Sequence, residues 1–249
     1  MPRFFIQFSY QGTHYHGSQI QPNAISIQEV LEDRLSKMTR TQIRIVAAGR
    51  TDAGVHAKEM FAHFEMDHFE FDQKFLFRLN GFLPKDIAVQ FIFEVAKDAH
   101  ARFDATARSY EYHIARKKDV FGEFTTYFVK QDLNVELMNK ACEILFQYTD
   151  FEAFSKLHSD VFTFNCDIKK AFWEVKENTL VFHITANRFL RNMVRAIVGT
   201  LLRIGKEQLT LEEFKAVIES KNRGNAGESV PAKGLFLTHV EYPESIHHV

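Results

Sequence analysis

Cysteine is scarce in this sequence, with Cys142 and Cys166 the only two among 249 residues. One pair in a chain of this length is not the disulfide framework of a small secreted domain, and its spacing matches no zinc-binding motif. We therefore expect two free thiols in a reducing compartment. The start of the chain lacks the order of basic, apolar and small residues that marks a signal peptide, which also favours a cytoplasmic protein.

Long hydrophobic runs and an excess of either charge are missing as well. No apolar run reaches the roughly 18 residues that cross a membrane, so no membrane partner is expected. The formal net charge is −1, which argues against a uniformly basic nucleic-acid-binding domain. The sequence has no G-x-G-x-x-G fingerprint, no true P-loop and no G-x-S-x-G elbow. We therefore predict neither a cofactor nor a metal.

Phenylalanine, in contrast, is abundant, with 26 residues. The favoured interpretation is a thick aromatic core, and the alternative is a special device such as rings that stack on nucleotide bases. The positive charge is also unevenly distributed. Residues 186 to 206 contain no acidic residue but five basic ones: Arg188, Arg191, Arg195, Arg203 and Lys206. A second enriched stretch comprises Arg102, Arg108, Arg116, Lys117 and Lys118. These stretches indicate either ordinary exposed faces or contact with a polyanion.

The hydrophobic periodicity predicts two successive sets of strands and helices. The first set is a strand at 3–10, a helix at 26–38, strands at 42–48 and 60–66, a helix at 73–83 and a strand at 87–95. The second set is a strand at 108–116, a helix at 135–148, strands at 168–177 and 179–187, helices at 189–205 and 210–220, and a strand at 234–242. This order predicts an α+β fold. No Pro-, Gly- or Ser-rich linker separates the sets, so the predicted domains, 1–104 and 105–249, have a soft boundary.

The segment GRTDAGVHA, Gly49 to Ala57, places one carboxylate in a tight turn between two predicted strands. One interpretation is that Asp52 only stabilises its own turn, as aspartate often does. The other is that Asp52 is a nucleophile, which requires a nearby guanidinium to keep the carboxylate ionised. Arg50 is near in sequence, and Arg195 on the predicted basic helix is the better geometric candidate. Arg188, Arg191 and Arg195 are spaced to share one face of that helix.

Several segments, in order along the chain, resemble the tRNA pseudouridine synthase A family. AGRTDAGVHA is similar to its aspartate motif, and YQGTHYHGSQIQPNAISIQEVLE to its N-terminal segment. ARFDATARSYEYHI resembles its arginine- and tyrosine-bearing motif, ANRFLRNMVRAIVGTLLRIG its signature helix, and AGESVPAKGLFLTHVEY its C-terminal strand. The resemblance implies the pseudouridine synthase fold, with two ferredoxin- or RRM-like α/β halves that share a mainly antiparallel sheet with a central active-site cleft.

The resemblance also implies an activity and roles for individual residues. It implies isomerisation of uridine to pseudouridine at positions 38 to 40 of the tRNA anticodon stem-loop, by a cytoplasmic homodimer without a cofactor. Asp52 would be the nucleophile, Tyr110 would stack on the flipped uracil and is a candidate base, and Arg195 would pair with Asp52. The expected tRNA contacts are Tyr110, Arg50, Arg102, Arg188 and Arg191.

One residue departs from the family pattern, because Gly17-Ser18-Gln19 stands where Gly-Trp-Gln is usual. The change puts local packing or a substrate contact in question. Two other classes of function are weighed against the enzyme. An RNA-binding protein that has lost catalysis would lack Asp52, Tyr110 or Arg195, and all three are present. An unrelated glycosidase or phosphoryl-transfer enzyme would need a second positioned acid or a metal cluster. Whether Asp52 attacks C6 of the base or C1′ of the sugar, or assists formation of a glycal, is left open.

Overall fold

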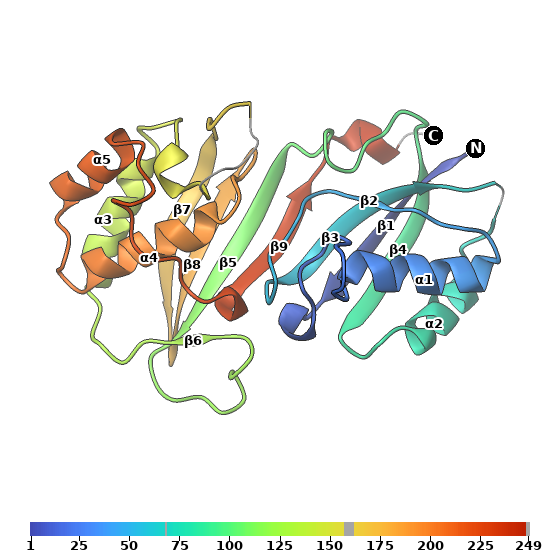
Figure 1. The fold of residues 1–249 in the computed structure, drawn as a ribbon, viewed down its shortest axis with the longest axis horizontal. Coiled ribbons are helices and arrows are strands. Elements are labelled where there is room, and N and C mark those ends of the chain that lie inside the picture. Colours follow the sequence, from blue (N-terminus) through green and yellow to red (C-terminus); the bar gives the residue numbers. More distant parts are fainter. Residues whose placement is uncertain (68, 157–161, 248–249) are drawn as a thin grey trace. The chain divides into compact units, whose positions relative to one another are not determined.

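The computed structural model describes residues 1–67, 69–156 and 162–247, which form two compact units (Figure 1). The first unit comprises residues 1–107 and the segment from Phe236 onward, and the second comprises Arg108–Leu235. The predicted α+β class with mainly antiparallel strand pairing is confirmed. The domain limits 1–104 and 105–249, and a shared sheet with a central cleft, stay predictions.

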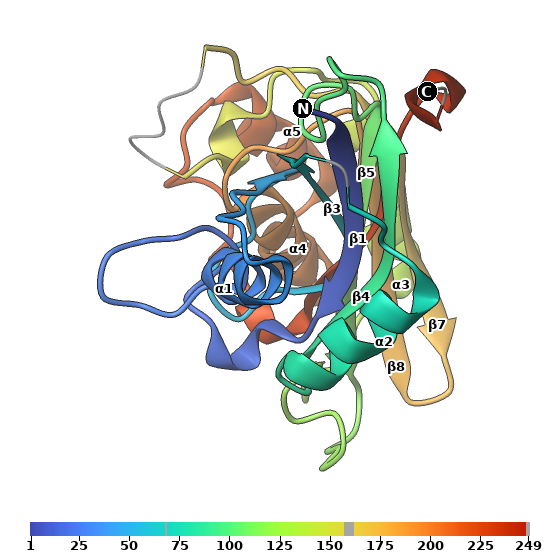
Figure 2. The same ribbon diagram turned by 90° about the vertical axis from the view of Figure 1, so that its right-hand side faces the viewer.

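The first unit is built around a mixed sheet in the order β4-β1-β3-β9. Its elements are β1 (Arg3–Tyr10), α1 (Ile27–Thr39), β2 (Val46–Ala47), β3 (His56–Glu65), α2 (Gln73–Phe82), β4 (Ile87–Val95) and β9 (Leu235–Glu241). Strand β1 pairs antiparallel with β3 and β4, and β9 runs parallel to β3. Helix α1 lies beside β1, and α2 beside β4 (Figure 2).

The core of this unit is aromatic, as the sequence predicts. Alternate β1 residues Phe4, Ile6, Phe8 and Tyr10 are buried on one face of the sheet, and Phe5 is buried on the other. The other residues of that second face, Arg3, Gln7 and Ser9, are polar and partly exposed, so from Ile6 onward β1 alternates buried apolar with partly exposed polar residues.

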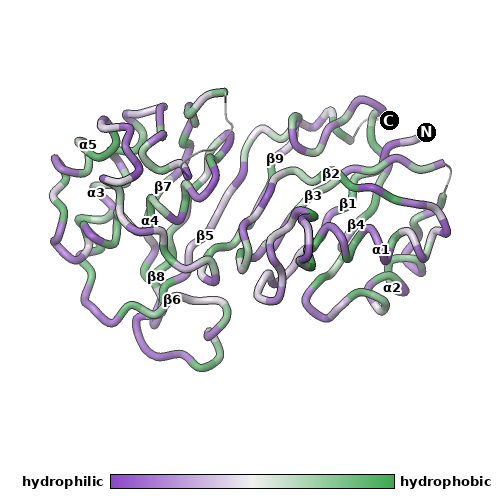
Figure 3. The backbone as a smooth tube through the Cα atoms, viewed as in Figure 1, coloured by the Kyte–Doolittle hydropathy of each residue, from purple (hydrophilic) through white to green (hydrophobic). Residues whose placement is uncertain are grey.

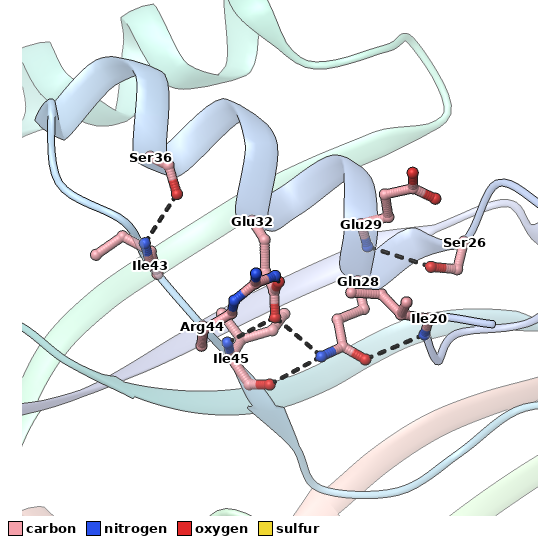
Figure 4. Close-up of polar contacts among 9 residues, drawn as sticks. All are labelled: Ile20, Ser26, Gln28, Glu29, Glu32, Ser36, Ile43, Arg44 and Ile45. Carbon is pink, nitrogen blue, oxygen red and sulfur yellow. Dashed lines mark hydrogen bonds and ion pairs between the residues drawn. The ribbon is translucent and has the colours of Figure 1, made fainter. Parts of the chain in front are cut away.

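The predicted strand at 42–48 is wrong over most of its length, because only Val46–Ala47 forms a strand. Figure 4 shows the reason: side chains of α1 supply the hydrogen bonds that a neighbouring strand would otherwise make. Ile43 N donates to Ser36 Oγ at 2.8 Å, and Ile45 N donates to Glu32 Oε1 at 3.0 Å. The Glu32 carboxylate is buried and also accepts from Arg44 at 2.7 Å. Residues 42–45 are therefore held against a helix, and only Val46–Ala47 joins the sheet.

The second unit has an antiparallel sheet in the order β5-β8-β7, with β6 parallel to β5. Its elements are β5 (Ala107–Ala115), β6 (Tyr127–Phe128), α3 (Val135–Leu145), β7 (Ile168–Lys176), β8 (Thr179–Ala186), α4 (Met193–Gly205) and α5 (Leu211–Glu219). Tyr112, Phe182 and Trp173 are register partners across these strands, and all three are buried. In Figure 3, hydrophobic and hydrophilic residues alternate along the strands and helices of this unit.

The predicted helix at 189–205 begins four residues late, at Met193. Asn192 has a φ of 68°, which a helix does not admit, and the Arg191 carbonyl accepts from Lys156 N at 3.0 Å instead of a helical partner. Arg188 and Arg191 therefore lie before the helix. The predicted helical face shared by Arg188, Arg191 and Arg195 is wrong.

Both cysteines are buried free thiols, as predicted. Burial raises the pKa of the Cys166 thiol to about 11 and that of Cys142 further still. Among the described residues, no helix combines the length and apolar character that a membrane crossing requires.

Candidate active site

Asp52 opens a tight turn between β2 and β3. Val55 N donates to the Asp52 carbonyl at 3.2 Å, and Gly54 adopts a φ of 77°, which favours glycine. The main chain therefore closes this turn, so that closure does not itself require the carboxylate. The Asp52 residue is partly exposed, whereas Thr51 before it and Val55 after it are buried.

Thr51, the residue before Asp52, is bonded through both of its main-chain groups to Ser18. Ser18 N donates to the Thr51 carbonyl at 3.1 Å, and Thr51 N donates to Ser18 Oγ at 2.8 Å. The Thr51 hydroxyl is also 2.8 Å from the Tyr10 hydroxyl. These bonds fix the backbone that leads into Asp52.

The N-terminus of α1 supports the other side of Ser18. Ile27 N donates to the Gly17 carbonyl and Gln28 N to the Ser18 carbonyl, at 3.3 and 3.0 Å. Gly17 has a φ of 100°, and a Cβ there would lie 2.8 Å from the Thr51 oxygen. Only glycine admits both the conformation and this approach. The helix, the Gly17–Ser18 segment and the aspartate turn thus form one hydrogen-bonded series.

In the second unit, Tyr110 lies on β5 with its side chain partly exposed. Its ring meets the ring of Phe189 edge to face, with centroids 5.1 Å apart and an interplanar angle of 87°. This contact is a favourable aromatic geometry, and it restricts the orientation of Tyr110. A partly exposed, oriented aromatic ring can stack on a planar ligand.

Arg195 lies in the first turns of α4 and is held by the Val230–Pro231 segment. Its Nε donates to the Val230 carbonyl at 2.7 Å, and Val230 N donates to the Arg195 carbonyl at 3.3 Å. Tyr112 donates its hydroxyl to the Pro231 carbonyl at 2.8 Å. Burial raises the pKa of Tyr112 well above its ordinary value, with Tyr127 adding to the effect and the Arg195 charge opposing it. The guanidinium is therefore oriented by the same segment that anchors Tyr112.

The remaining predicted residues lie on loops. Arg50 is exposed beside the aspartate turn, and Arg102 lies over the Phe103 ring at 5.7 Å; both belong to the first unit. Arg191 is exposed and Arg188 partly exposed in the second unit. The structure thus places Asp52, Arg50 and Arg102 in one unit and Tyr110, Arg195, Arg188 and Arg191 in the other.

The support given by Tyr10, Ser18 and Tyr112 was not predicted from the sequence. Ser18 attracted notice only as a departure from a family pattern. A usable signal was the pair Gly12 and Gly17, since glycines at such positions often mark a close backbone approach. A Cβ at Gly12 would lie 2.0 Å from the Val55 oxygen. Within the described residues, no group of three or more His, Cys, Asp or Glu is arranged to hold a metal ion.

Comparison with known proteins gives consistent matches over most of the chain. Residues 6–104 and 142–243 match the model of a family described as tRNA pseudouridine synthase. The chain is 51% identical over 247 residues to tRNA pseudouridine synthase A of Parabacteroides distasonis, covering 99% of this chain and 98% of that protein. It is 51% identical over 246 residues to the protein of the same name from Bacteroides fragilis, covering 98% of each. The Colwellia psychrerythraea protein of that name is 37% identical over 246 residues, 98% of this chain and 95% of its own length.

Proposed function

Because this chain belongs to the tRNA pseudouridine synthase A family, we propose that it converts uridine to pseudouridine at positions 38 to 40 of the tRNA anticodon stem-loop. Its class is that of an isomerase, tRNA pseudouridine synthase A, EC 5.4.99.12. The observation that carries the proposal is 51% identity over 247 residues, nearly the whole chain, to a protein of that name. The sites, the tRNA positions and the quaternary structure are our finer proposals.

The reaction breaks the C1′–N1 glycosidic bond, turns the uracil and joins C5 to C1′. Atoms are conserved and no net oxidation occurs. We assign Asp52 as the nucleophile. It follows Thr51, which is buried and hydrogen-bonded to Ser18, and it lies in a turn closed by the main chain. A carboxylate that is positioned in advance loses little freedom when it reacts, which lowers the barrier. The proposal leaves the attacked atom open between C6 and C1′, and the glycal route remains an alternative.

Tyr110 is assigned to the uracil itself. A target base inside a stem has to leave the stack, at a cost of a few kcal/mol. Stacking on an aromatic ring restores roughly 1–3 kcal/mol per base. The edge-to-face contact with Phe189 supports this role, because it holds the Tyr110 ring in one orientation. Tyr110 is also our candidate for the base that removes the C5 proton.

Arg195 is assigned as the cationic partner of Asp52. A guanidinium near a carboxylate keeps the carboxylate ionised, and the ionised form is the nucleophilic one. The support is the fixed geometry of Arg195, whose Nε donates to the Val230 carbonyl at 2.7 Å.

Arg50, Arg102, Arg188 and Arg191 are assigned to tRNA phosphates, since each carries an always-charged side chain on a loop. Phosphate contacts position a folded RNA without reading its sequence. We further propose a cytoplasmic homodimer in which one tRNA spans both subunits. The support for this arrangement is membership of the family.

The substitution Asp52→Asn tests the central assignment. It keeps the size and polarity of the side chain but removes the nucleophile, so we expect no pseudouridine in unmodified tRNA transcript and nearly unchanged tRNA affinity. The RNA is digested for chromatography and mapped by carbodiimide-stop sequencing. Asp98→Asn, at an exposed position in the same unit, is the matched control and should retain full activity. Clear turnover by the purified Asp52→Asn protein would refute the nucleophile.

An RNA-binding protein without catalysis is the alternative that the same experiment tests. A folded wild-type protein that binds the transcript but forms no product would favour that alternative. Product in another part of the tRNA would keep the activity and overturn the proposed positions.

A further inference from the structure

The segment between β5 and β6, residues 116–126, forms a loop whose two ends meet. Ile114 pairs with Tyr127 and Ala115 with Phe128 in the short parallel ladder, and Val129 N donates to the Ala115 carbonyl at 3.1 Å. Figure 1 shows the loop extending from the β6 label. Since β5 also carries Tyr110, the loop continues the strand that holds a proposed substrate contact.

The loop is held by its own hydrogen bonds. Phe121 N donates to Asp119 Oδ1 at 2.9 Å, and the Gly122 carbonyl accepts from both the main-chain N and the hydroxyl of Thr126, each at 2.9 Å. A Cβ at Gly122 would lie 2.5 Å from Asp119 Oδ2, so this turn is tightly closed. A loop ordered in advance binds with a smaller entropy loss than a flexible one.

Two apolar side chains stand at the tip of this ordered loop. Phe121 is 96% exposed and Val120 is 69% exposed, and Phe124 nearby is 55% exposed. Phe77, Phe103 and several other phenylalanines are exposed as well, so exposure alone does not distinguish Phe121; it is distinguished by its place on an ordered loop beside cations. Figure 3 shows hydrophobic and hydrophilic residues following each other along the loop. Apolar groups clustered on an ordered surface commonly mark a site of interaction.

The acidic and basic side chains of the loop differ in their bonding. Asp119 accepts the Phe121 N–H, and Glu123 is bonded through both its carbonyl and its carboxylate to Lys233, at 2.7 and 3.5 Å. By contrast, Arg116, Lys117 and Lys118 are exposed, and no described side chain pairs with them. The two acidic residues therefore hold the loop together and attach it to Lys233, which we call the anchor. The three adjacent cations face solvent near the exposed ring of Phe121.

From this combination we infer that the 116–126 loop binds RNA, with Phe121 stacked on an unpaired base and Arg116, Lys117 and Lys118 on neighbouring phosphates. The inference deepens the proposed function and rests on it for the identity of the RNA as tRNA. Base stacking with cationic phosphate contacts is the usual means of binding unpaired nucleotides. A second copy of this chain is a poor occupant, because two such loops facing each other would bring like charges together.

The anchor links this loop to the proposed site of the second unit. Lys233 lies two residues after Pro231, whose carbonyl accepts the Tyr112 hydroxyl, and three after Val230, which accepts from Arg195. The loop that would hold the RNA is thus bonded to the segment that orients Arg195.

Binding of RNA by Phe121→Ala, Phe121→Trp and wild type tests the inference. The probes are unmodified tRNA transcript, a single-stranded oligonucleotide and a blunt RNA duplex, followed by fluorescence anisotropy. We expect Phe121→Ala to weaken binding of the tRNA and the single strand about tenfold, with Phe121→Trp restoring it and the duplex little affected. Phe77→Ala is the matched control, since Phe77 is 82% exposed and lies beside Arg78. Because Phe121 is almost fully exposed, its loss leaves the core intact, which thermal unfolding verifies.

The cations have a test of their own. Lys117→Ala and Lys118→Ala should each make the dependence of RNA affinity on salt shallower. The negative slope of log affinity against log salt should decrease in magnitude by about 1 for each variant. The two proposals can fail separately. If the wild-type protein makes no pseudouridine but Phe121→Ala still weakens its RNA binding tenfold, the proposed function is rejected and RNA binding by the loop is supported. RNA affinity within twofold of wild type in Phe121→Ala, with unchanged salt slopes for the lysine variants, would overturn the inference. A change in oligomer mass by light scattering without loss of single-strand affinity would also overturn it, and would assign the loop to contact between copies.

Discussion

At the scale of single residues, the two hydrogen bonds between Ser18 and Thr51 connect distant parts of the sequence at the residue before Asp52. The family resemblance leads us to expect tryptophan at the position of Ser18. An indole carries one N–H donor and no acceptor, so a tryptophan side chain cannot accept the Thr51 N–H as serine does. The support of the Asp52 turn in this chain therefore has a feature that the family resemblance does not supply.

The substitution Ser18→Ala leaves the buried Thr51 N–H without its acceptor. Such a loss costs about 1–3 kcal/mol, so we expect a lower unfolding free energy by this amount in urea denaturation. If the bond also positions Asp52, kcat falls about tenfold while KM for tRNA changes little.

Ser18→Thr is the control for this substitution, because it keeps the hydroxyl and should restore kcat. Equal kcat and equal unfolding free energy in Ser18→Ala and wild type would show that the bond to Thr51 N contributes nothing measurable. Loss of stability alone would leave the serine a structural residue.

At the scale of elements, α4 is positioned by direct contact between backbones. A Cβ at Gly199 in the middle of this helix would lie 1.8 Å from the Glu228 carbonyl oxygen. Gly227 N donates to the Thr200 hydroxyl at 2.8 Å, which fixes the segment that runs along the helix. The next residues include Val230, the acceptor for Arg195. The small residue on the helix thus permits the approach that orients the arginine.

Two glycine-to-alanine substitutions in helices should have opposite effects. Gly199→Ala forces backbone atoms apart, and overpacking of this kind costs about 1–3 kcal/mol or more. Gly81→Ala in α2 meets nothing within 4 Å, so the helix preference for alanine should raise stability by roughly 0.5–1 kcal/mol.

Urea denaturation of the two variants beside wild type measures both changes. Equal unfolding free energies for Gly199→Ala and wild type would contradict the close backbone contact. A destabilised Gly81→Ala would contradict the open surroundings of that position.

At the scale of the whole molecule, the balance of charge is close to neutral, with 31 basic and 32 acidic residues. Net charge alone therefore gives no attraction to RNA, and the proposed binding by the 116–126 loop depends on the local cations Arg116, Lys117 and Lys118. Protonation can change this balance at acid pH, because the chain contains 12 histidines. One of them is His63, whose pKa is lowered to about 4 by burial, with the charges of His100 and Arg3 adding to the effect. Its Nδ1 accepts Ala101 N at 3.1 Å and so requires the neutral ring.

The stability of the protein should fall as the pH is lowered from about 6.5 to about 4. Over this range the unfolded chain binds a proton at His63 and the folded chain does not, so acid favours unfolding. A lowering from 6.5 to about 4 corresponds to no more than about 3 kcal/mol. Urea denaturation at pH 7 and pH 5 measures the difference.

His63→Asn is the matched variant for this pH dependence, since its amide oxygen can accept the Ala101 N–H without titrating. Its unfolding free energy should change less between pH 7 and pH 5 than that of wild type. The same change in both proteins would assign the acid sensitivity to other groups.

The sequence by itself determined the elements in which local preference and burial agree. Strands 3–10 and 87–95 form as predicted, and the predicted helix at 210–220 forms as α5, whose start is held by a capping box between Thr210 and Glu213. Such elements follow from side-chain periodicity and from bonds between residues close in sequence. The motif GRTDAGVHA likewise predicted the turn that carries Asp52, because Gly54 supplies a backbone conformation that other residues resist.

Only the tertiary structure decided where distant side chains replace regular backbone bonding. Ile43 and Ile45 fit a strand pattern, but Ser36 and Glu32 on a helix take their N–H groups. The predicted start of α4 at residue 189 was wrong for a similar reason, since Lys156 N donates a hydrogen bond to the Arg191 carbonyl. Ser18 and Thr51 are 33 residues apart, and no local pattern predicts their bond. The energy of such contacts depends on which groups the completed fold buries together, and this is not encoded in the spacing of neighbouring residues.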